Sequence, residues 1–329
     1  MVELETLAAF DLFQWLRTGH RAAAQLGCNQ STVSRATCRC QELFGVRLER
    51  REAEWVVCGD AELLLAERRV HQVHRWGGGR PLRLDAQAWL RESYAAVSLP
   101  RWSLGNLNYL EYDRPCALLR QRVIDAWLCS APDLPRDPEL AAIQLCAMPT
   151  LLMARRDHPL FARGAALTIA EAAAYPVLPL PSGAFPVFME RFSALGFSMA
   201  GRLIETQLQD PQAEAREDLF LGIASPLTLA QYEADWRPLP LQLDLPVGDA
   251  VVVRREFAGH PRTLDLVQRL SAHLRQLCCD RDDVELLDPS PAGRPDRPSE
   301  RPSERPSERP SDRPGRPAPA ALGDTSALS

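Results

Sequence analysis

The sequence predicts a multi-domain chain in which a small all-α unit is followed by a helix, an α/β domain and an extended tail. Three observations support this fold class. Helix-period apolar patterns separated by glycine turns fill residues 1–58. Residues 82–288 alternate strand-like and helix-like stretches, which is typical of an α/β domain, and we expect parallel sheets there. Residues 289–329 are dominated by a repeat of Arg, Pro, Ser and acid.

The composition is that of a globular protein without a diffuse charge of one sign. The 329 residues carry a net charge of -5 and are 46% hydrophobic, so an anionic partner needs a local arrangement of arginines. Nine scattered cysteines include no CxxC pair, and we interpret them as reduced thiols of a cytoplasmic protein without a metal or cofactor. The N-terminus lacks a signal-peptide pattern, and no run of about 18 apolar residues suggests a membrane partner.

The first 58 residues predict three helices and a two-stranded wing. Thr18 and Asn29 are suitable N-caps for the second and third helices, and Gly27 and Gly45 suit the turns that end them. The expected helices cover about residues 4–17, 19–25 and 30–44, and the expected strands cover residues 46–51 and 54–57.

One face of the third helix carries small hydroxyls and arginines. On a helical wheel the buried arc comprises Val33, Thr37, Cys40 and Phe44, flanked by Ala36 and Leu43. The opposite face comprises Ser31, Thr32, Arg35, Arg39 and Glu42. Short hydroxyls let a helix sit deep in a groove, and arginine offers a pair of donors that matches guanine or phosphate. A helix, a tight turn and such a second helix form the helix-turn-helix arrangement that enters the DNA major groove, although a helical hairpin with a solvated face is the alternative.

Residues 60–76 predict a further helix with an apolar side that includes Leu63, Leu64, Val70 and Val73. The segment WGGGRP, residues 76–81, ends this helix and forms a hinge. A free helix with an apolar side has to bury it on its own domain or on a partner's copy. We therefore assign residues 59–81 as a linker and dimerisation segment.

The N-terminal stretch RAAAQLGCNQSTVSRATCRCQELFGVRLERR resembles the winged helix-turn-helix of LysR-type transcriptional regulators. The matching positions are Arg21-Ala22-Ala23, Leu26, Gln30, Val33-Ser34-Arg35 and Phe44-Gly45-Val46-Arg47-Leu48. Gly19 departs from the family, which usually has an aromatic residue there, and the wing segment Leu48-Glu49-Arg50 lacks an apolar anchor.

The resemblance implies a DNA-binding surface on the third helix and the wing. Gln30, Ser31, Thr32 and Arg35 would contact the groove, and Arg39, Arg47, Arg50 and Arg51 would hold the phosphate backbone. The partners implied are double-stranded DNA, a second copy in a homodimer or homotetramer, and RNA polymerase. The linker helix would join two chains so that two recognition helices meet half-sites about 34 Å apart or a multiple of that.

The resemblance extends into the larger region, where it implies a two-lobed α/β effector-binding domain similar to periplasmic binding proteins. The stretches that carry it are residues 151–180, 220–227 and 251–270. We place lobe I at residues 82–148 and 250–288 and lobe II at residues 149–249. A small-molecule effector of unknown identity would bind between the lobes and change how dimers assemble on DNA.

Loops at strand ends and helix starts are where such a cleft binds its ligand. The candidate effector-binding residues are Gln87, Asp113, Arg114, Ser130, Ser182, Gly183 and Gln207. A solvated loop residue or a helix cap is the alternative for each of them. Leu84-Asp85-Ala86-Gln87 replaces the small polar loop usual after the family's first strand, so the effector is expected to differ from the usual small carboxylates or to be absent.

Two other functions remain open at the level of sequence. A small-molecule binding or assembly protein whose N-terminal unit no longer binds DNA would explain the departures at Gly19 and in the wing. An enzyme would need a cluster of acid and base residues, but HExxH, GxSxG and phosphate-loop motifs are absent from the sequence and we expect no catalysis. The proline-rich repeat in residues 289–329 predicts a disordered, polyproline-leaning tail, either dispensable or a regulated binding segment.

Overall fold

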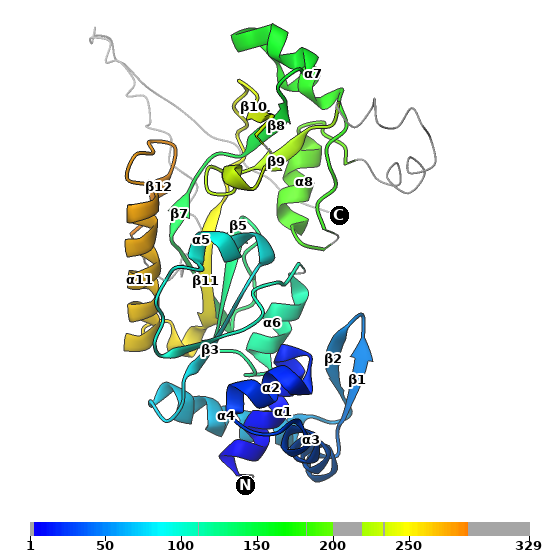
Figure 1. Ribbon diagram of the computed structural model, residues 1–329, viewed down its shortest axis with the longest axis vertical. Helices are drawn as coiled ribbons and strands as arrows, with labels where there is room; N and C mark the ends of the chain where they lie inside the picture. Colours follow the sequence, from blue (N-terminus) through cyan, green and yellow to red (C-terminus); the bar gives the residue numbers. More distant parts are fainter. Residues whose placement is uncertain (1–2, 111, 182, 200–218, 233, 289–329) are drawn as a thin grey trace, which may run out of the picture. The chain divides into compact units, whose positions relative to one another are not determined.

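The computed structural model describes residues 3–110, 112–181, 183–199, 219–232 and 234–288 (Figure 1). The predicted tail and the candidate residues Ser182 and Gln207 lie outside the described residues. Within these ranges, no helix is long and apolar enough to cross a membrane.

The N-terminal part contains the three helices and the wing that the sequence predicts. The elements are α1 (Leu4–Leu16), α2 (Gly19–Leu26), α3 (Gln30–Phe44), β1 (Arg47–Arg51) and β2 (Glu54–Cys58). Thr18 caps α2 by accepting a hydrogen bond from the backbone of Arg21. Gly27 and Gly45 end α2 and α3 with φ values of 66° and 64°, a backbone region that favours glycine. Asn29 precedes α3 as predicted, but its side chain forms no capping hydrogen bond.

Two predicted apolar arcs need correction. Leu43 is 55% exposed, so the buried face of α3 consists of Val33, Ala36, Thr37, Cys40 and Phe44 only. On α4 (Glu62–Trp76), Leu64 packs into the core of the N-terminal part, whereas the other three predicted apolar residues face solvent. The reason is angular, because Leu64 lies about 100° around the helix from Leu63.

Lobe I contains a five-stranded sheet with the strand order β4-β3-β5-β11-β6. Its strands are β3 (Leu82–Ala86), β4 (Trp102–Leu104), β5 (Ala126–Ala131), β6 (Leu140–Gln144) and β11 (Gly248–Arg254). β3 runs parallel to β4 and β5, but β11 runs antiparallel to β5 and β6. The expectation of a parallel sheet therefore holds for β3, β4 and β5 but is wrong for β11, because this strand returns from lobe II and enters the sheet in the opposite direction.

The two faces of this sheet are covered by different parts of the chain. Val251 and Val253 of β11 pack on the side of α11 (Pro261–Leu277), and Ala250 and Val252 pack on the side of α6 (Asp113–Arg120). This alternation is the period of two expected for a strand buried on both faces. The α6 side also receives α1 and α2 through Trp15 and its apolar neighbours, so the N-terminal part shares a core with lobe I.

Lobe II is smaller and its three-stranded sheet is antiparallel, in the order β10-β8-β9. Its elements are β8 (Leu151–Arg155), α7 (Ile169–Ala173), α8 (Pro186–Ala194), β9 (Gly222–Ala224) and β10 (Trp236–Pro238). The two connections between the lobes lie side by side, because Met148 and Val247 exchange backbone hydrogen bonds of 2.8 and 2.9 Å.

Short elements complete the described chain. They are η1 (Ala88–Leu90), α5 (Arg91–Tyr94), β7 (Cys146–Ala147), η2 (Pro159–Ala166), η3 (Leu229–Gln231), η4 (Arg255–Phe257) and β12 (Glu285–Leu286). Tyr109 and Val177 form isolated β-bridges outside the named strands. Leu107 has a positive φ of 49°, and Pro176 and Pro179 lack the N–H that a strand ladder requires.

Candidate nucleic-acid interface and ligand pocket

The exposed face of α3 carries the hydroxyl and arginine side chains that the sequence predicts there. Ser31, Thr32, Arg35 and Arg39 are all exposed. The Arg35 guanidinium donates only to the backbone oxygen of Ser31 on its own helix, at 3.4 Å. Within the described residues, neither arginine of this face forms an ion pair, so both keep their charge and donors available to an external partner.

The wing places a second group of arginines beside α3. The backbone N–H of Leu48 donates to the Gln41 side chain on α3 at 2.7 Å, which fixes β1 against that helix. Arg47, Arg50 and Arg51 of β1 are exposed, and Arg51 pairs with Glu49 at 3.0 Å. The surface formed by α3 and β1 is therefore locally positive although the whole chain is acidic.

Gln30, at the start of α3, lies beside Gly19. At the position of Gly19 the family that the sequence resembles usually has an aromatic residue. A Cβ atom built on Gly19 would lie 3.1 Å from Cγ of Gln30. The Gln30 side chain therefore occupies part of the space beside Gly19, while the residue as a whole remains exposed.

A third group of arginines is buried between α1, α4 and lobe I. We term these arginines and their carboxylate partners the buried ion-pair network. Asp11 of α1 accepts from Arg68 of α4 at 2.8 Å and pairs with Arg83 of β3 at 3.3 Å. Asp125 accepts two hydrogen bonds from Arg75 of α4, at 2.9 and 3.0 Å. Burial lowers the pKa of Arg83 to about 10, with nearby Arg75 adding to the effect. The network joins the linker helix to both neighbouring parts of the chain.

The wing also contacts lobe I through ion pairs. Glu54 at the start of β2 pairs with Arg17 at 2.5 Å and with Arg114 of α6 at 3.2 Å. The indole of Trp55 donates to the backbone oxygen of Arg17 at 2.9 Å. The guanidinium of Arg114 is thus directed to the wing.

The face of α4 opposite the buried ion-pair network is apolar and exposed. Leu63, Val70 and Val73 are 60%, 52% and 55% exposed, and Ala66 is exposed between them. These residues follow the helical spacing of one stripe. The buried side of the helix carries four polar residues besides Leu64 and Trp76, whereas this apolar stripe faces solvent, unlike that of an ordinary surface helix.

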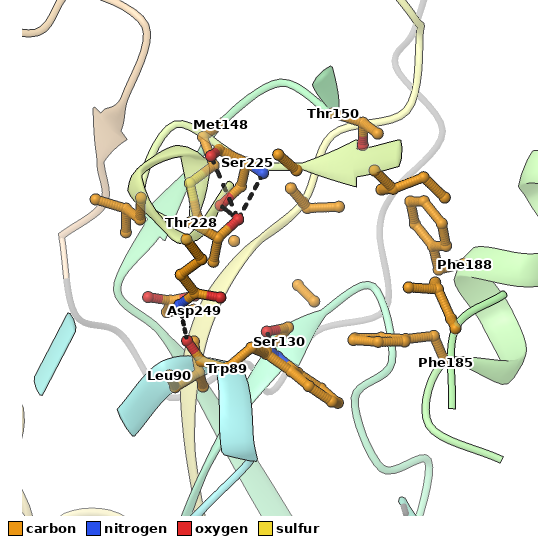
Figure 2. A pocket seen from close by; sticks show the side chains of 18 of the residues that line it. Trp89, Leu90, Ser130, Met148, Thr150, Phe185, Phe188, Ser225, Thr228 and Asp249 are labelled. Atoms are coloured by element: carbon orange, nitrogen blue, oxygen red, sulfur yellow. Dashed lines mark hydrogen bonds between the residues drawn. The ribbon is translucent and has the colours of Figure 1, made fainter. Parts of the chain in front are cut away.

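A pocket of about 360 Å³ lies between the two lobes. The Trp89 ring of lobe I packs against the Phe185 ring of lobe II, with the centroids 4.3 Å apart and the planes tilted by 35°, and Gln231 of lobe II donates to the Trp89 backbone oxygen at 3.0 Å. Figure 2 shows Phe185 and Phe188 on one side of this pocket and Asp249, Ser225 and Thr228 on the other. The lining is mostly apolar with a few convergent polar groups, as is typical of a small-molecule site.

Asp249 of β11 is the buried acid of this pocket. It is 1% exposed, and its Oδ2 accepts from the Tyr94 hydroxyl at 2.7 Å. Burial raises the pKa of Asp249 to about 6, against the smaller lowering effect of the Tyr94 hydrogen bond.

The candidate effector-binding residues fall into three groups. Ser130 lines the pocket, where its hydroxyl accepts from the Trp89 indole at 3.1 Å. Gln87 does not line the pocket, but its side-chain oxygen accepts a hydrogen bond from the backbone N–H of Ser130 at 2.9 Å. Asp113, Arg114 and Gly183 do not line the pocket. Asp113 is exposed at the start of α6, Arg114 is held by the wing, and Gly183 is exposed beyond Pro181.

Several pocket residues were not among the sequence-based candidates, notably Trp89, Phe185, Ser225, Thr228 and Asp249. Ser225 follows the Gly222–Ala224 strand within the family-like segment of residues 220–227, which was a usable signal. Asp249 directly precedes the apolar residues Ala250–Val253 of the same strand, and the sequence around it does not indicate a pocket residue.

The sequence and the fold of this chain are similar to those of known proteins. Residues 106–275 match the family described as the LysR substrate binding domain. Full-length OxyR from Pseudomonas aeruginosa, a cysteine variant, is similar at 15% identity and a TM-score of 0.51, covering 84% of this chain and 95% of that one. A probable transcriptional regulator from Pseudomonas aeruginosa has 20% identity, a TM-score of 0.49 and coverage of 82% and 97%. None of the curated proteins compared with the sequence matches it.

The structural similarity to the OxyR chain concerns the fold alone at this identity. The family match covers more than half of the 329 residues and includes lobe II and the part of lobe I from residue 106 to residue 275. The chain therefore belongs to the LysR family, and residues 106–275 are its LysR substrate-binding domain.

Proposed function

We propose that the chain is a LysR-type transcriptional regulator that binds double-stranded DNA through α3 and the wing and responds to a small molecule in the pocket between its lobes. The family is one of regulators rather than of enzymes, and the role assigned here is binding. As a regulator of transcription the protein would act on DNA in the cytoplasm, with RNA polymerase as a further partner.

The exposed face of α3 is the observation that carries this proposal. The exposed hydroxyls of this face, and its arginines, which form no ion pair among the described residues, match the chemistry of the major groove, where arginine pairs with guanine or phosphate. Arg35 sits at the centre of this face, with Gln30, Ser31 and Thr32 toward the start of the helix. Arg39, Arg47, Arg50 and Arg51 contact the phosphate backbone around it.

The apolar stripe on α4 supports assembly as a dimer. Leu63, Ala66, Val70 and Val73 face solvent, and burying a leucine or valine side chain on a second copy contributes at most about 1.5–3 kcal/mol. Two copies of α4 in contact would carry two α3 helices, so that the operator consists of two half-sites. Tetramers would need a further interface between the effector-binding domains.

A short chain of contacts links the pocket to the DNA-binding part. The indole of Trp15 on α1 donates to Asp85 at the end of β3 at 2.6 Å. Two residues further on, Gln87 holds the backbone of Ser130, whose hydroxyl is bound by Trp89 in the pocket wall. A ligand that moves Trp89 therefore acts on the strand end that holds α1.

A salt titration of DNA binding tests the proposal. Duplexes recovered by the purified full-length chain from sheared genomic DNA would be labelled and titrated by fluorescence anisotropy at increasing salt. We expect the logarithm of the affinity to fall linearly with the logarithm of salt, with a slope of about −0.9 for each phosphate neutralised. Recovery of no duplex, or binding that does not depend on salt, would favour a small-molecule binding protein that has lost DNA contact.

A further inference from the structure

Asp249 places a carboxylate in the pocket wall without a cation beside it. The residue is 1% exposed, and the Tyr94 hydroxyl is the side-chain donor that reaches its carboxylate, at Oδ2. No lysine occurs in the sequence, and no arginine or histidine is among the described residues that line the pocket. A buried carboxylate of this kind is costly unless a cation or further donors compensate it.

The groups packed around Asp249 do not supply that compensation. Tyr94 of α5, Cys146 of β7 and Cys278 of the α11 end face it from the surrounding elements, and Cys129 of β5 lies nearby on the other face of the sheet. Burial raises the pKa of each of these groups above its ordinary value, to about 12 for Cys146. All four are therefore neutral near pH 7, and none of them titrates between pH 5 and pH 8.

Aromatic rings form much of the remaining lining. Trp89 and Phe185 come from the two lobes and pack against each other at a tilt, and Phe188 and Tyr232 also line the pocket. The faces of such rings attract cations as well as apolar groups. The other polar residues of the lining are Ser130, Thr150, Ser225, Thr228, Gln231 and Tyr232.

We propose that the effector is a small organic amine that is protonated and carries an aromatic or other apolar ring, with its ammonium group on Asp249 and its ring among Trp89, Phe185 and Phe188. This inference rests on the proposed function, because it takes the pocket as the effector site. A carboxylate ligand is disfavoured, since it would bring a second negative charge into an apolar pocket that holds no cation. The small carboxylates usual for the family are therefore poor ligands of this chain.

Three probes that share one ring and differ in charge test this ligand class. Binding of 2-phenylethylamine, 2-phenylethanol and 3-phenylpropionate to the full-length chain would be measured by calorimetry without DNA. We expect the amine to bind about tenfold or more tightly than the alcohol, and the carboxylate to bind most weakly. Asp249→Asn should reduce the amine to the affinity of the alcohol. The matched control Asp244→Asn removes an exposed carboxylate outside the pocket and should leave all three affinities unchanged.

A pH series on the unmodified chain gives the same test without a variant. Because the pKa of Asp249 is raised to about 6, its carboxylate is fully ionised at pH 7.5 and mostly protonated at pH 5. The amine should therefore bind roughly tenfold more weakly at pH 5 than at pH 7.5, whereas the alcohol should bind equally at both. The amine itself stays protonated throughout this range.

Carboxylate binding as tight as that of the amine, amine binding that does not depend on Asp249 or pH, or no binding of any probe at millimolar concentration would overturn the ligand class. These results are independent of DNA binding. A chain that binds the amine but no duplex would refute the regulator and leave the ligand class standing. A chain that binds a duplex but prefers the carboxylate would refute the ligand class and leave the regulator standing.

Discussion

The arginines of α3 and β1 and the arginines of the buried ion-pair network are the same residue type in opposite environments. Arg35 and Arg39 are exposed and form no ion pair among the described residues, whereas Arg68 and Arg75 are at most 4% exposed and each is held by a carboxylate. The first group offers its charge to an external partner. The second group uses its charge to hold the linker helix against α1 and lobe I. Whether an arginine is paired with a carboxylate, and not how many arginines a region contains, distinguishes a binding surface from a structural network.

The largest expected effect comes from breaking the buried ion-pair network. Asp125→Asn removes the negative charge that holds Arg75, and removing one partner of a buried pair costs about 3–5 kcal/mol of unfolding free energy. Urea denaturation followed by circular dichroism measures this loss. Asp265→Asn is the matched control, because its pair with Arg269 is exposed and should contribute less than about 1 kcal/mol. Equal losses in the two variants would mean that the network does not stabilise the fold.

A smaller effect is expected from the apolar stripe of α4. Val70→Glu places a charge on the 52% exposed valine at the centre of the stripe. We expect dimers to dissociate at concentrations where the unmodified chain remains dimeric, as measured by sedimentation velocity. Leu264→Glu makes the same change on α11, where the leucine is 50% exposed and off the stripe, and should not alter assembly. Dimers that survive Val70→Glu would move the interface elsewhere.

The smallest effect is expected from a single wing arginine. Arg47→Ala removes one phosphate contact, so binding should weaken by a similar factor on all duplex sequences, and the salt slope should become shallower by about one unit. Anisotropy titrations at several salt concentrations measure both quantities. A change in sequence preference instead would show that Arg47 reads bases.

The α3 surface was predictable from the sequence because its determinants are local. The spacing of Val33, Thr37 and Cys40 fixes which side of the helix is buried and leaves Arg35 and Arg39 outside. Thr18, Gly27 and Gly45 mark the ends of the helices in the same way. The predicted helices and the wing of the N-terminal part are confirmed within a few residues.

The environment of α4 was not predictable because its partners are remote in sequence. Arg68 bonds to Asp11, 57 residues away, and Arg75 bonds to Asp125, 50 residues away. Periodicity alone assigns the apolar side of a helix to the interior, and here that side faces solvent. Arg114 shows the same problem, because a helix start suggested a ligand contact whereas Glu54 of the wing takes its guanidinium.

Binding of an operator duplex by Arg35→Ala tests the central claim most directly. The account predicts that this variant loses about 1–3 kcal/mol of binding free energy on the preferred duplex and keeps its unfolding free energy, because Arg35 is exposed and, among the described residues, its side chain hydrogen-bonds only to Ser31 of its own helix. Arg101→Ala, which removes an exposed arginine far from α3 in sequence, should bind as the unmodified chain does. Equal duplex affinity for Arg35→Ala and the unmodified chain would contradict the assignment of α3 as the recognition helix.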